Sequence, residues 1–168
     1  MSESKEQKAA LPEDKLFGLP GFPDKEYLKS GPVAVIECPE EIACNVCEAA
    51  CPFGAIEVGK EIKRVPEINP EKCVGCGQCV SQCPGLAVYV VDMNYTDGKA
   101  LLTIPYEFSR VPEEGESVIG ITREGNKASK VKVESVDKKE NGTNIVKIVV
   151  PKPEIHKIRG IFIEENEN

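Results

Sequence analysis

Residues 73–84 run Cys73-Val74-Gly75-Cys76-Gly77-Gln78-Cys79-Val80-Ser81-Gln82-Cys83-Pro84, and this cysteine-rich segment organises the rest of the chain. Two residues separate each of the first three cysteines, three more precede the fourth, and a proline follows. Gly75 and Gly77 can adopt turns with positive φ that other residues avoid. One short loop can therefore wrap the first three cysteines around a single centre, whereas Cys83 points towards another site.

This spacing is a ligand pattern for 4Fe–4S clusters, in which the fourth cysteine serves a second cluster. A zinc site and a disulfide knot are the alternatives. Zinc sites use paired cysteines rather than three in tandem, and disulfide frameworks usually spread through short secreted chains. All eight cysteines of this 168-residue chain lie between Cys38 and Cys83. We therefore predict iron–sulfur ligands.

An internal repeat supports this prediction independently. Residues 44–56 overlie residues 76–88 when shifted by 32 positions, so that Cys44, Cys47 and Cys51 match Cys76, Cys79 and Cys83. Asn45 takes the place of Gly77, and asparagine tolerates the left-handed conformation that glycine adopts. We expect two similar halves.

Apolar runs suggest the elements around the cysteines. Residues 33–36 and 86–92 are β-branched or apolar and predict a pair of strands, while residues 56–58 and 65–68 predict a small hairpin. Short helices are expected at residues 48–51 and 80–83. The predicted class is α+β, with a pseudo-twofold βαββαβ unit over residues 33–93.

With these motifs, residues 33–93 resemble a bacterial-type dicluster ferredoxin with two 4Fe–4S clusters. In that family the ligands interleave. The resemblance implies one cluster on Cys73, Cys76, Cys79 and Cys51, and a second on Cys44, Cys47, Cys83 and a further ligand.

That further ligand departs from the family pattern. The repeat places Glu41 where Cys73 predicts a cysteine, and the nearest thiol is Cys38, with five residues between it and Cys44. Cys38 could complete a full cubane, the site could hold a 3Fe–4S cluster, or Glu41 could supply an oxygen ligand. Thiolate suits a soft iron–sulfide corner better than carboxylate, so Cys38 is the favoured ligand.

The remaining segments lack metal ligands. Residues 1–32 predict an extended N-terminal arm whose bulky apolar residues Leu16, Phe17, Leu19 and Phe22 could pack on the chain itself or, as we favour, on a partner. Residues 94–168 contain five short strand patterns separated by Gly-containing turns, which predict a small β-barrel or sandwich followed by an acidic tail. His156, the single histidine, is interpreted as a polar surface residue.

Charge and hydropathy limit the function classes. The net charge is −7, without a basic block, which argues against nucleic-acid binding. Residues 33–95 carry nine acidic and four basic side chains, so an acidic face could steer a basic partner. No apolar run reaches the roughly 20 residues of a membrane span, and the charged start lacks a secretory signal. We expect a cytoplasmic protein.

Two clusters in one domain can relay single electrons. The arm and the β module exceed what a free ferredoxin needs, and therefore favour an electron-transfer subunit of a larger, flavin-containing oxidoreductase that is not catalytic on its own. The segment from Cys38 to Cys47 also resembles small iron–sulfur proteins that accompany flavin-dependent dehydrogenases of the proline or hydroxyproline type, which implies a flavoprotein partner. A free ferredoxin shuttle and a structural or regulatory iron–sulfur protein are the alternatives.

Overall fold

The computed structural model describes residues 10–61 and 64–164; the charged start and the acidic tail, predicted at the two ends, extend into residues outside these ranges. The strands are β1 (Val33–Ile36), β2 (Ile56–Glu57), β3 (Glu67–Ile68), β4 (Val88–Thr96), β5 (Lys99–Tyr106), β6 (Ser117–Thr122), β7 (Lys127–Asp137), β8 (Asn144–Pro151) and β9 (Ile158–Phe162). The helices are α1 (Glu13–Leu16), α2 (Lys25–Leu28), α3 (Val46–Ala50), α4 (Gln78–Gln82) and the 3₁₀ turn η1 (Lys152–Glu154).

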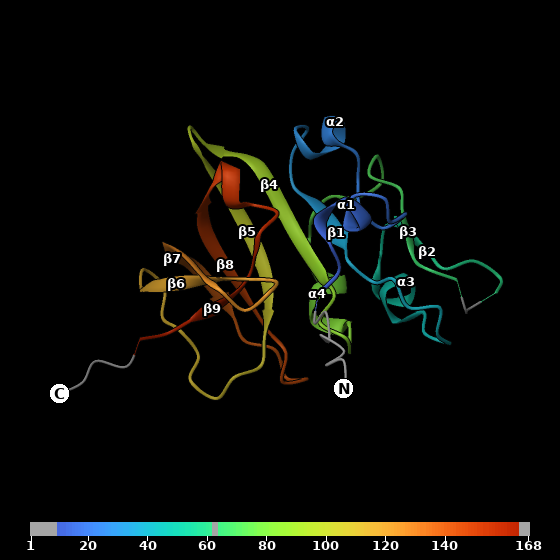
Figure 1. The fold of residues 1–168 in the computed structure, drawn as a ribbon. Coiled ribbons are helices and arrows are strands. Elements are labelled where there is room, and N and C mark those ends of the chain that lie inside the picture. Colours follow the sequence, from blue (N-terminus) through green and yellow to red (C-terminus); the bar gives the residue numbers. More distant parts are fainter. Residues whose placement is uncertain (1–9, 62–63, 165–168) are drawn as a thin grey trace, which may run out of the picture.

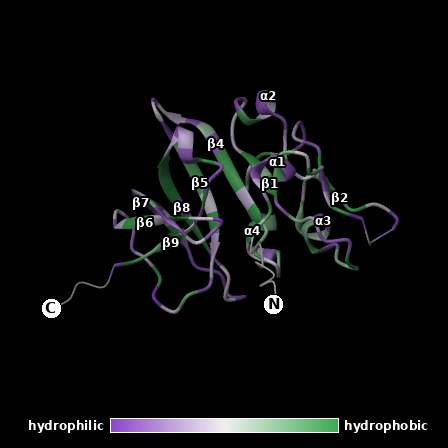
Figure 2. Cartoon of the chain, in the orientation of Figure 1, coloured by the Kyte–Doolittle hydropathy of each residue, from purple (hydrophilic) through white to green (hydrophobic). Residues whose placement is uncertain are grey.

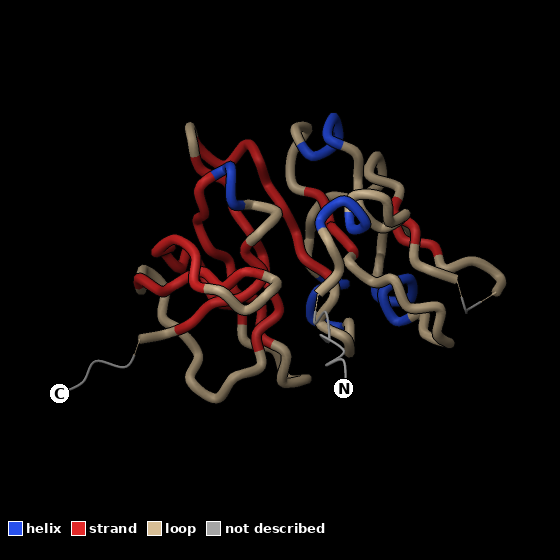
Figure 3. The backbone as a smooth tube through the Cα atoms, in the orientation of Figure 1, coloured by secondary structure: helices blue, strands red, loops and turns tan. Residues whose placement is uncertain are grey.

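The predicted elements of the cysteine-rich half are present. β1 pairs antiparallel with β4, with Val33 opposite Val91 and Ile36 opposite Val88, and β2 pairs antiparallel with β3. The repeat is also visible in three dimensions, since α3 and α4 begin and end 32 residues apart and pack against each other. Both helices begin two residues earlier than predicted. The segments that bear the cysteines are otherwise loops (Figure 3).

The five strands predicted in the C-terminal part exist, but they form no closed barrel within the described part of the chain. They join the first half in one seven-stranded sheet of order β1-β4-β5-β8-β7-β6-β9. β4 continues to Thr96 and turns back through Asp97-Gly98 into β5, so it pairs with β1 on one side and β5 on the other. In Figure 1, β4 runs between the two parts of the molecule. The barrel prediction was wrong because it overlooked Asp97-Gly98, a hairpin signal that extends the sheet across residue 93.

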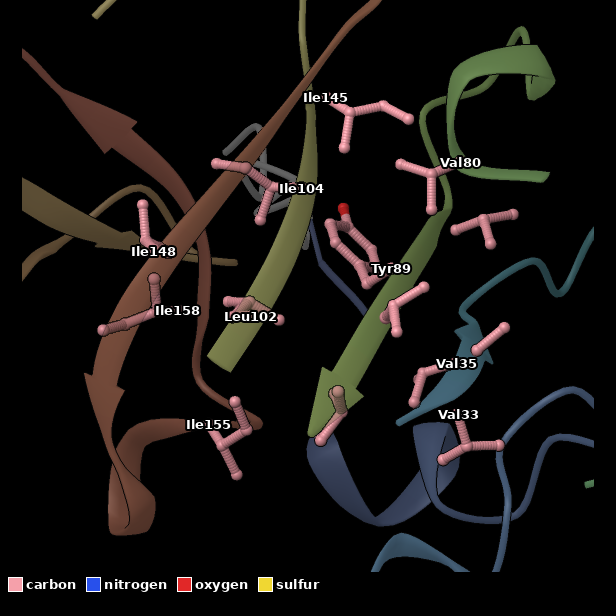
Figure 4. Close-up of a cluster of buried hydrophobic side chains, with 14 of the residues drawn as sticks. Val33, Val35, Val80, Tyr89, Leu102, Ile104, Ile145, Ile148, Ile155 and Ile158 are labelled. Carbon is pink, nitrogen blue, oxygen red and sulfur yellow. The ribbon is translucent and has the colours of Figure 1, made fainter. Parts of the chain in front are cut away.

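The hydrophobic core is aliphatic and continuous across both halves. Val35, Val91, Leu102, Ile148 and Val150 are fully buried. Apolar residues concentrate along β4 and the strands beside it (Figure 2). The close-up in Figure 4 shows side chains from α4, β4, β5 and β8 within the same cluster. The helix α4, which carries Cys79, therefore packs on the large sheet.

The N-terminal segment packs on the chain itself. Leu16 and Phe22 are buried, which corrects the expectation that a partner covers them, although Phe17 remains 42% exposed. The Ile36 amide donates to the Gly21 carbonyl at 2.8 Å, and the Ile68 amide donates to the Pro20 carbonyl at 3.2 Å. The segment is not extended throughout, because α1 and α2 each form one turn, α2 being capped by the Asp24 carboxylate.

Among residues 10–61 and 64–164, no helix has the length and apolar character needed to cross a lipid bilayer.

Candidate iron–sulfur site

The structure brings four of the predicted ligands to one hollow of about 310 Å³, counting the space at its open mouth. Its wall contains Cys51, Cys73, Cys76 and Cys79, which come from both halves of the repeat. We call it the regular hollow. Gly75 and Gly77 shape its loop with φ values of +68° and +78°, as the sequence predicts. Gly75 also lies against the residue before β1, since a Cβ there would be 2.6 Å from the Pro32 Cβ.

The thiols of the regular hollow face one another in a largely apolar setting. Burial, together with the nearby thiols of Cys73, Cys76 and Cys51, raises the pKa of Cys79 to about 12. The Ala34 amide donates to the Cys73 Sγ and the Ala55 amide donates to the Cys51 Sγ, both at 3.3 Å. Amide donors to cysteine sulfur stabilise the thiolate form and tune the potential of an iron–sulfur centre. Without a metal, the Cys79 thiol would stay protonated at neutral pH.

The other four cysteines line a second, wider hollow of about 870 Å³, counting the space at its open mouth. We call it the irregular hollow; its wall contains Cys38, Cys44, Cys47 and Cys83. Burial, joined by the charges of Cys83 and Cys44, raises the pKa of Cys47 to about 11. The same three influences, with burial again the largest, raise the pKa of Cys38.

The insertion between Cys38 and Cys44 forms part of this wall. Pro39, Glu40 and Ile42 face the irregular hollow, whereas Glu41 is exposed and does not line it. The insertion also changes the loop that follows. Asn45 has φ −134°, not the left-handed conformation of its counterpart Gly77, so that expectation was wrong. The repeat therefore holds for the helices but not for this turn.

The donor set suits an iron–sulfur cluster. Each hollow presents four thiol groups, and cysteine thiolates are the usual ligands of 4Fe–4S clusters, which carry single electrons when bound. Among residues 10–61 and 64–164, no three His, Cys, Asp or Glu side chains gather in a way that could hold a single metal ion. The thiols are instead distributed around two spaces.

A buried ion network beside the irregular hollow was not predicted from the sequence. Glu37, which precedes Cys38, pairs with Arg123 at 2.5 Å and with Arg159 at 2.8 Å. Burial alone would raise the pKa of Glu37, but the hydrogen bond from Arg123 and the charge of Arg159 hold it below its ordinary value. The two arginines lie 86 and 122 residues from Glu37 along the chain, and no local pattern marks them.

His156 was also misjudged, because it is not a free surface residue. Its ring lies 5.7 Å from that of Phe17 and 5.5 Å from that of Phe22. Its Nδ1 is buried and has no hydrogen-bond partner among the residues that the structure describes. Burial, and then the charge of Arg159, lowers the pKa of His156 to about 4. The ring therefore packs in its neutral form between the N-terminal segment and the C-terminal sheet.

Comparison with known families agrees with this geometry. Residues 42–87 match the family described as 4Fe-4S dicluster domain. That range contains every cysteine except Cys38. The family has 4Fe–4S clusters, so the match does not support the 3Fe–4S alternative, and it leaves the role of Cys38 open.

Curated relatives are similar to parts of this chain. The chain is 50% identical over 40 residues to a subunit of the Na(+)-translocating ferredoxin:NAD(+) oxidoreductase complex of Acetobacterium woodii, a match that covers 24% of this chain and 11% of the relative. It is 47% identical over 47 residues to a subunit of an ion-translocating oxidoreductase complex of Methanosarcina acetivorans, covering 28% of this chain and 17% of the relative.

A third match covers a larger share of the chain. The beta subunit of a dissimilatory-type sulfite reductase of Archaeoglobus fulgidus is 33% identical over 87 residues, which covers 48% of this chain and 23% of the relative. Each of these matches therefore spans less than a quarter of the relative's length. No solved structure matches the fold at a significant level.

Proposed function

We propose that this chain, whose residues 42–87 form a 4Fe-4S dicluster domain, is an iron–sulfur electron-transfer subunit of an oxidoreductase complex. The observation that carries the proposal is the pair of four-thiol hollows, whose helices α3 and α4 are in contact. Three similar proteins are named as subunits of oxidoreductase complexes or of a reductase. We further propose a flavoprotein partner and a cytoplasmic location.

The proposed ligand sets follow the two hollows. Cys51, Cys73, Cys76 and Cys79 would hold one 4Fe–4S cluster, and Cys38, Cys44, Cys47 and Cys83 would hold the other. Cys38 lines the irregular hollow together with Cys44, Cys47 and Cys83, whereas Glu41 does not line it, and this contrast favours the thiol as fourth ligand. The burial of Cys47 and Cys79 favours charge compensation by bound iron.

Exposed apolar side chains beside both hollows suggest where the partner docks. Phe53 and Val74 line the regular hollow and are 49% and 52% exposed, while Ile42 lines the irregular hollow and is 53% exposed. This part of the chain is acidic, with nine acidic and four basic side chains over residues 33–95. An apolar centre within acidic surroundings suits a partner with a basic rim.

We propose that the chain consists of two structural units that follow an N-terminal segment. Residues 33–93 would carry the electron-transfer domain and residues 94–168 a β module that braces it and contacts the complex, with residues 1–32 as an N-terminal segment. The continuous sheet supports bracing, because β4 belongs to both parts.

The test begins with full-length protein prepared without oxygen. We expect iron and sulfide for two 4Fe–4S clusters and reversible reduction of both by electron paramagnetic resonance (EPR). Cys38→Ser should weaken or convert one cluster and spare the other, whereas the matched variant Glu41→Gln should change neither. Equal loss in both variants would contradict ligation by Cys38.

Anaerobic purification from the native cell tests the assignment to a complex. We expect a stoichiometric assembly that contains flavin and releases the chain at high salt. A monomer that reduces several unrelated acceptors would instead identify a free shuttle. Clusters that cannot be reduced reversibly would identify a structural or regulatory protein.

A further inference from the structure

Glu37, Arg123 and Arg159 form one buried ion network. The Arg159 Nε donates to Glu37 Oε1 at 2.9 Å, and the Arg123 Nε donates to Glu37 Oε2 at the same distance. The exposed fractions of the three side chains are 6%, 13% and 4%, in the order Glu37, Arg123 and Arg159. Buried charges persist only where partners compensate them, so each member of the network depends on the others.

The network contains two guanidinium groups and one carboxylate, which leaves one positive charge in excess. Backbone carbonyls accept from further donors of both arginines, since Arg159 Nη1 donates to Ile155 and Ile158 and Arg123 Nη2 donates to His156. Carbonyl dipoles reduce the cost of burying the excess charge but do not neutralise it. By contrast, the described lining of the regular hollow contains no Asp, Glu, Lys, Arg or His side chain.

One member of the network lines the irregular hollow, and another contacts the segment that follows Cys83. Glu37 lines that hollow and directly precedes Cys38, and its amide donates to the Ala87 carbonyl at 2.8 Å. Arg159 lies 4.9 Å from the ring centre of Tyr89, and the Tyr89 hydroxyl donates to the Leu86 carbonyl, three residues after Cys83. One arginine of β9 thus braces the segments that carry Cys38 and Cys83.

We propose that Arg159, with Arg123 and Glu37, positions Cys38 and Cys83 and raises the reduction potential of the cluster that these cysteines hold. Reduction adds negative charge to an iron–sulfur centre, and an excess positive charge in a buried setting favours that state. The inference rests on the proposed function, because it assumes a cluster bound by Cys38, Cys44, Cys47 and Cys83. The C-terminal sheet then tunes electron transfer as well as supporting the fold.

Substitutions that change the charge in opposite directions distinguish an effect on the reduction potential from a general loosening of the structure. Arg159→Met and Arg123→Gln each remove a positive charge, whereas Glu37→Gln removes the negative one. Anaerobic redox titration with EPR should show the cluster of the irregular hollow shifted to lower potential in the arginine variants and to higher potential in Glu37→Gln. At a fixed solution potential, we expect the ratio of reduced to oxidised cluster to change on the order of tenfold, which is about 59 mV for one electron.

The cluster of the regular hollow and a control variant serve as internal references. Arg110→Gln removes an arginine that is 54% exposed and pairs with Glu116, and it should leave both potentials unchanged. Shifts of the same sign in all network variants, or no shift in variants that retain full iron, would overturn the proposal. If Arg159→Met fails to fold, Arg123→Gln decides, because that side chain is more exposed and leaves the Arg159–Glu37 pair in place. Absence of two reversible clusters in the wild-type protein would refute the proposed function instead.

Discussion

Replacing Gly75 with alanine should selectively disrupt the cluster proposed in the regular hollow. Gly75 has φ +68°, and a Cβ there would lie 2.6 Å from the Pro32 Cβ and 2.9 Å from the Pro32 carbonyl oxygen. The left-handed conformation costs a non-glycine residue about 1–2 kcal/mol. Overpacking adds about 1–3 kcal/mol. Pro32 cannot easily move, because it leads directly into the buried strand β1.

The expected total is roughly 2–5 kcal/mol, a large part of the roughly 5–15 kcal/mol that stabilises a typical protein. Gly98→Ala is the matched control, since Gly98 has φ +69° but, apart from its two neighbours in the chain, no described residue lies within 4 Å of the position that an added Cβ would take. That variant should lose only the conformational term of about 1–2 kcal/mol. The difference between the two variants isolates the contact with Pro32.

Anaerobic denaturant titration measures the free energy of unfolding, while iron, sulfide and EPR measure cluster content. We expect Gly75→Ala to lose the signal of the Cys51, Cys73, Cys76 and Cys79 cluster, and Gly98→Ala to keep both signals. Equal destabilisation by the two substitutions, or a full complement of iron in Gly75→Ala, would refute the steric reasoning.

Three further predictions concern the body of the protein. The pKa of His156 is about 4 in the folded state against an ordinary value of 6.5, so the unfolded chain binds a proton at higher pH than the folded chain does. The contribution of the neutral ring to the free energy of unfolding is therefore fully present above pH 6.5. It falls by about 2 kcal/mol towards pH 4, after allowance for the partial exposure of the ring. His156→Phe should flatten this part of the pH profile of the melting temperature, and an unchanged profile would exclude His156 as its source. Gly21→Ala would place a Cβ 2.7 Å from the Ile36 Cβ and should speed hydrogen exchange in residues 10–30, whereas Gly18→Ala, with its nearest contact at 3.5 Å, should not; equal exchange in both variants would contradict this packing. Ile148→Ala removes a fully buried side chain of β8 and should lower the free energy of unfolding by about 2–5 kcal/mol in denaturant titration, and a loss below about 1 kcal/mol would contradict its central place in the core.

The two halves of the molecule are in contact at further points besides the ion network. The Asn141 side chain donates to the Ser81 carbonyl at 2.7 Å and so links the β7–β8 turn to α4. Ile145 of β8 lies beside Val80 of α4 in the core (Figure 4). The helix that follows Cys76 is therefore held by the C-terminal sheet, and the environment of both hollows depends on residues far from the cysteine motifs.

The sequence by itself determined the features that depend on local chemistry. Cysteine spacing and the 32-residue repeat indicated an iron–sulfur domain, because ligand geometry within one loop depends on neighbouring residues. The strand β1 followed from a β-branched run, and β5 to β9 followed from alternating apolar residues and Gly-containing turns. The positive φ of Gly75 and Gly77 was likewise predictable, because glycine adopts that conformation without steric cost.

The tertiary structure alone decided how distant segments meet. It joined the predicted β module to the ferredoxin-like half in one open sheet, since strand pairing depends on partners that a local pattern does not specify. It placed Cys38, and not Glu41, at the wall of the irregular hollow. It also gathered Glu37, Arg123 and Arg159 from remote positions into one buried network. Single charged residues carry no sequence signal of their partners, because the compensation that permits their burial exists only in the folded chain.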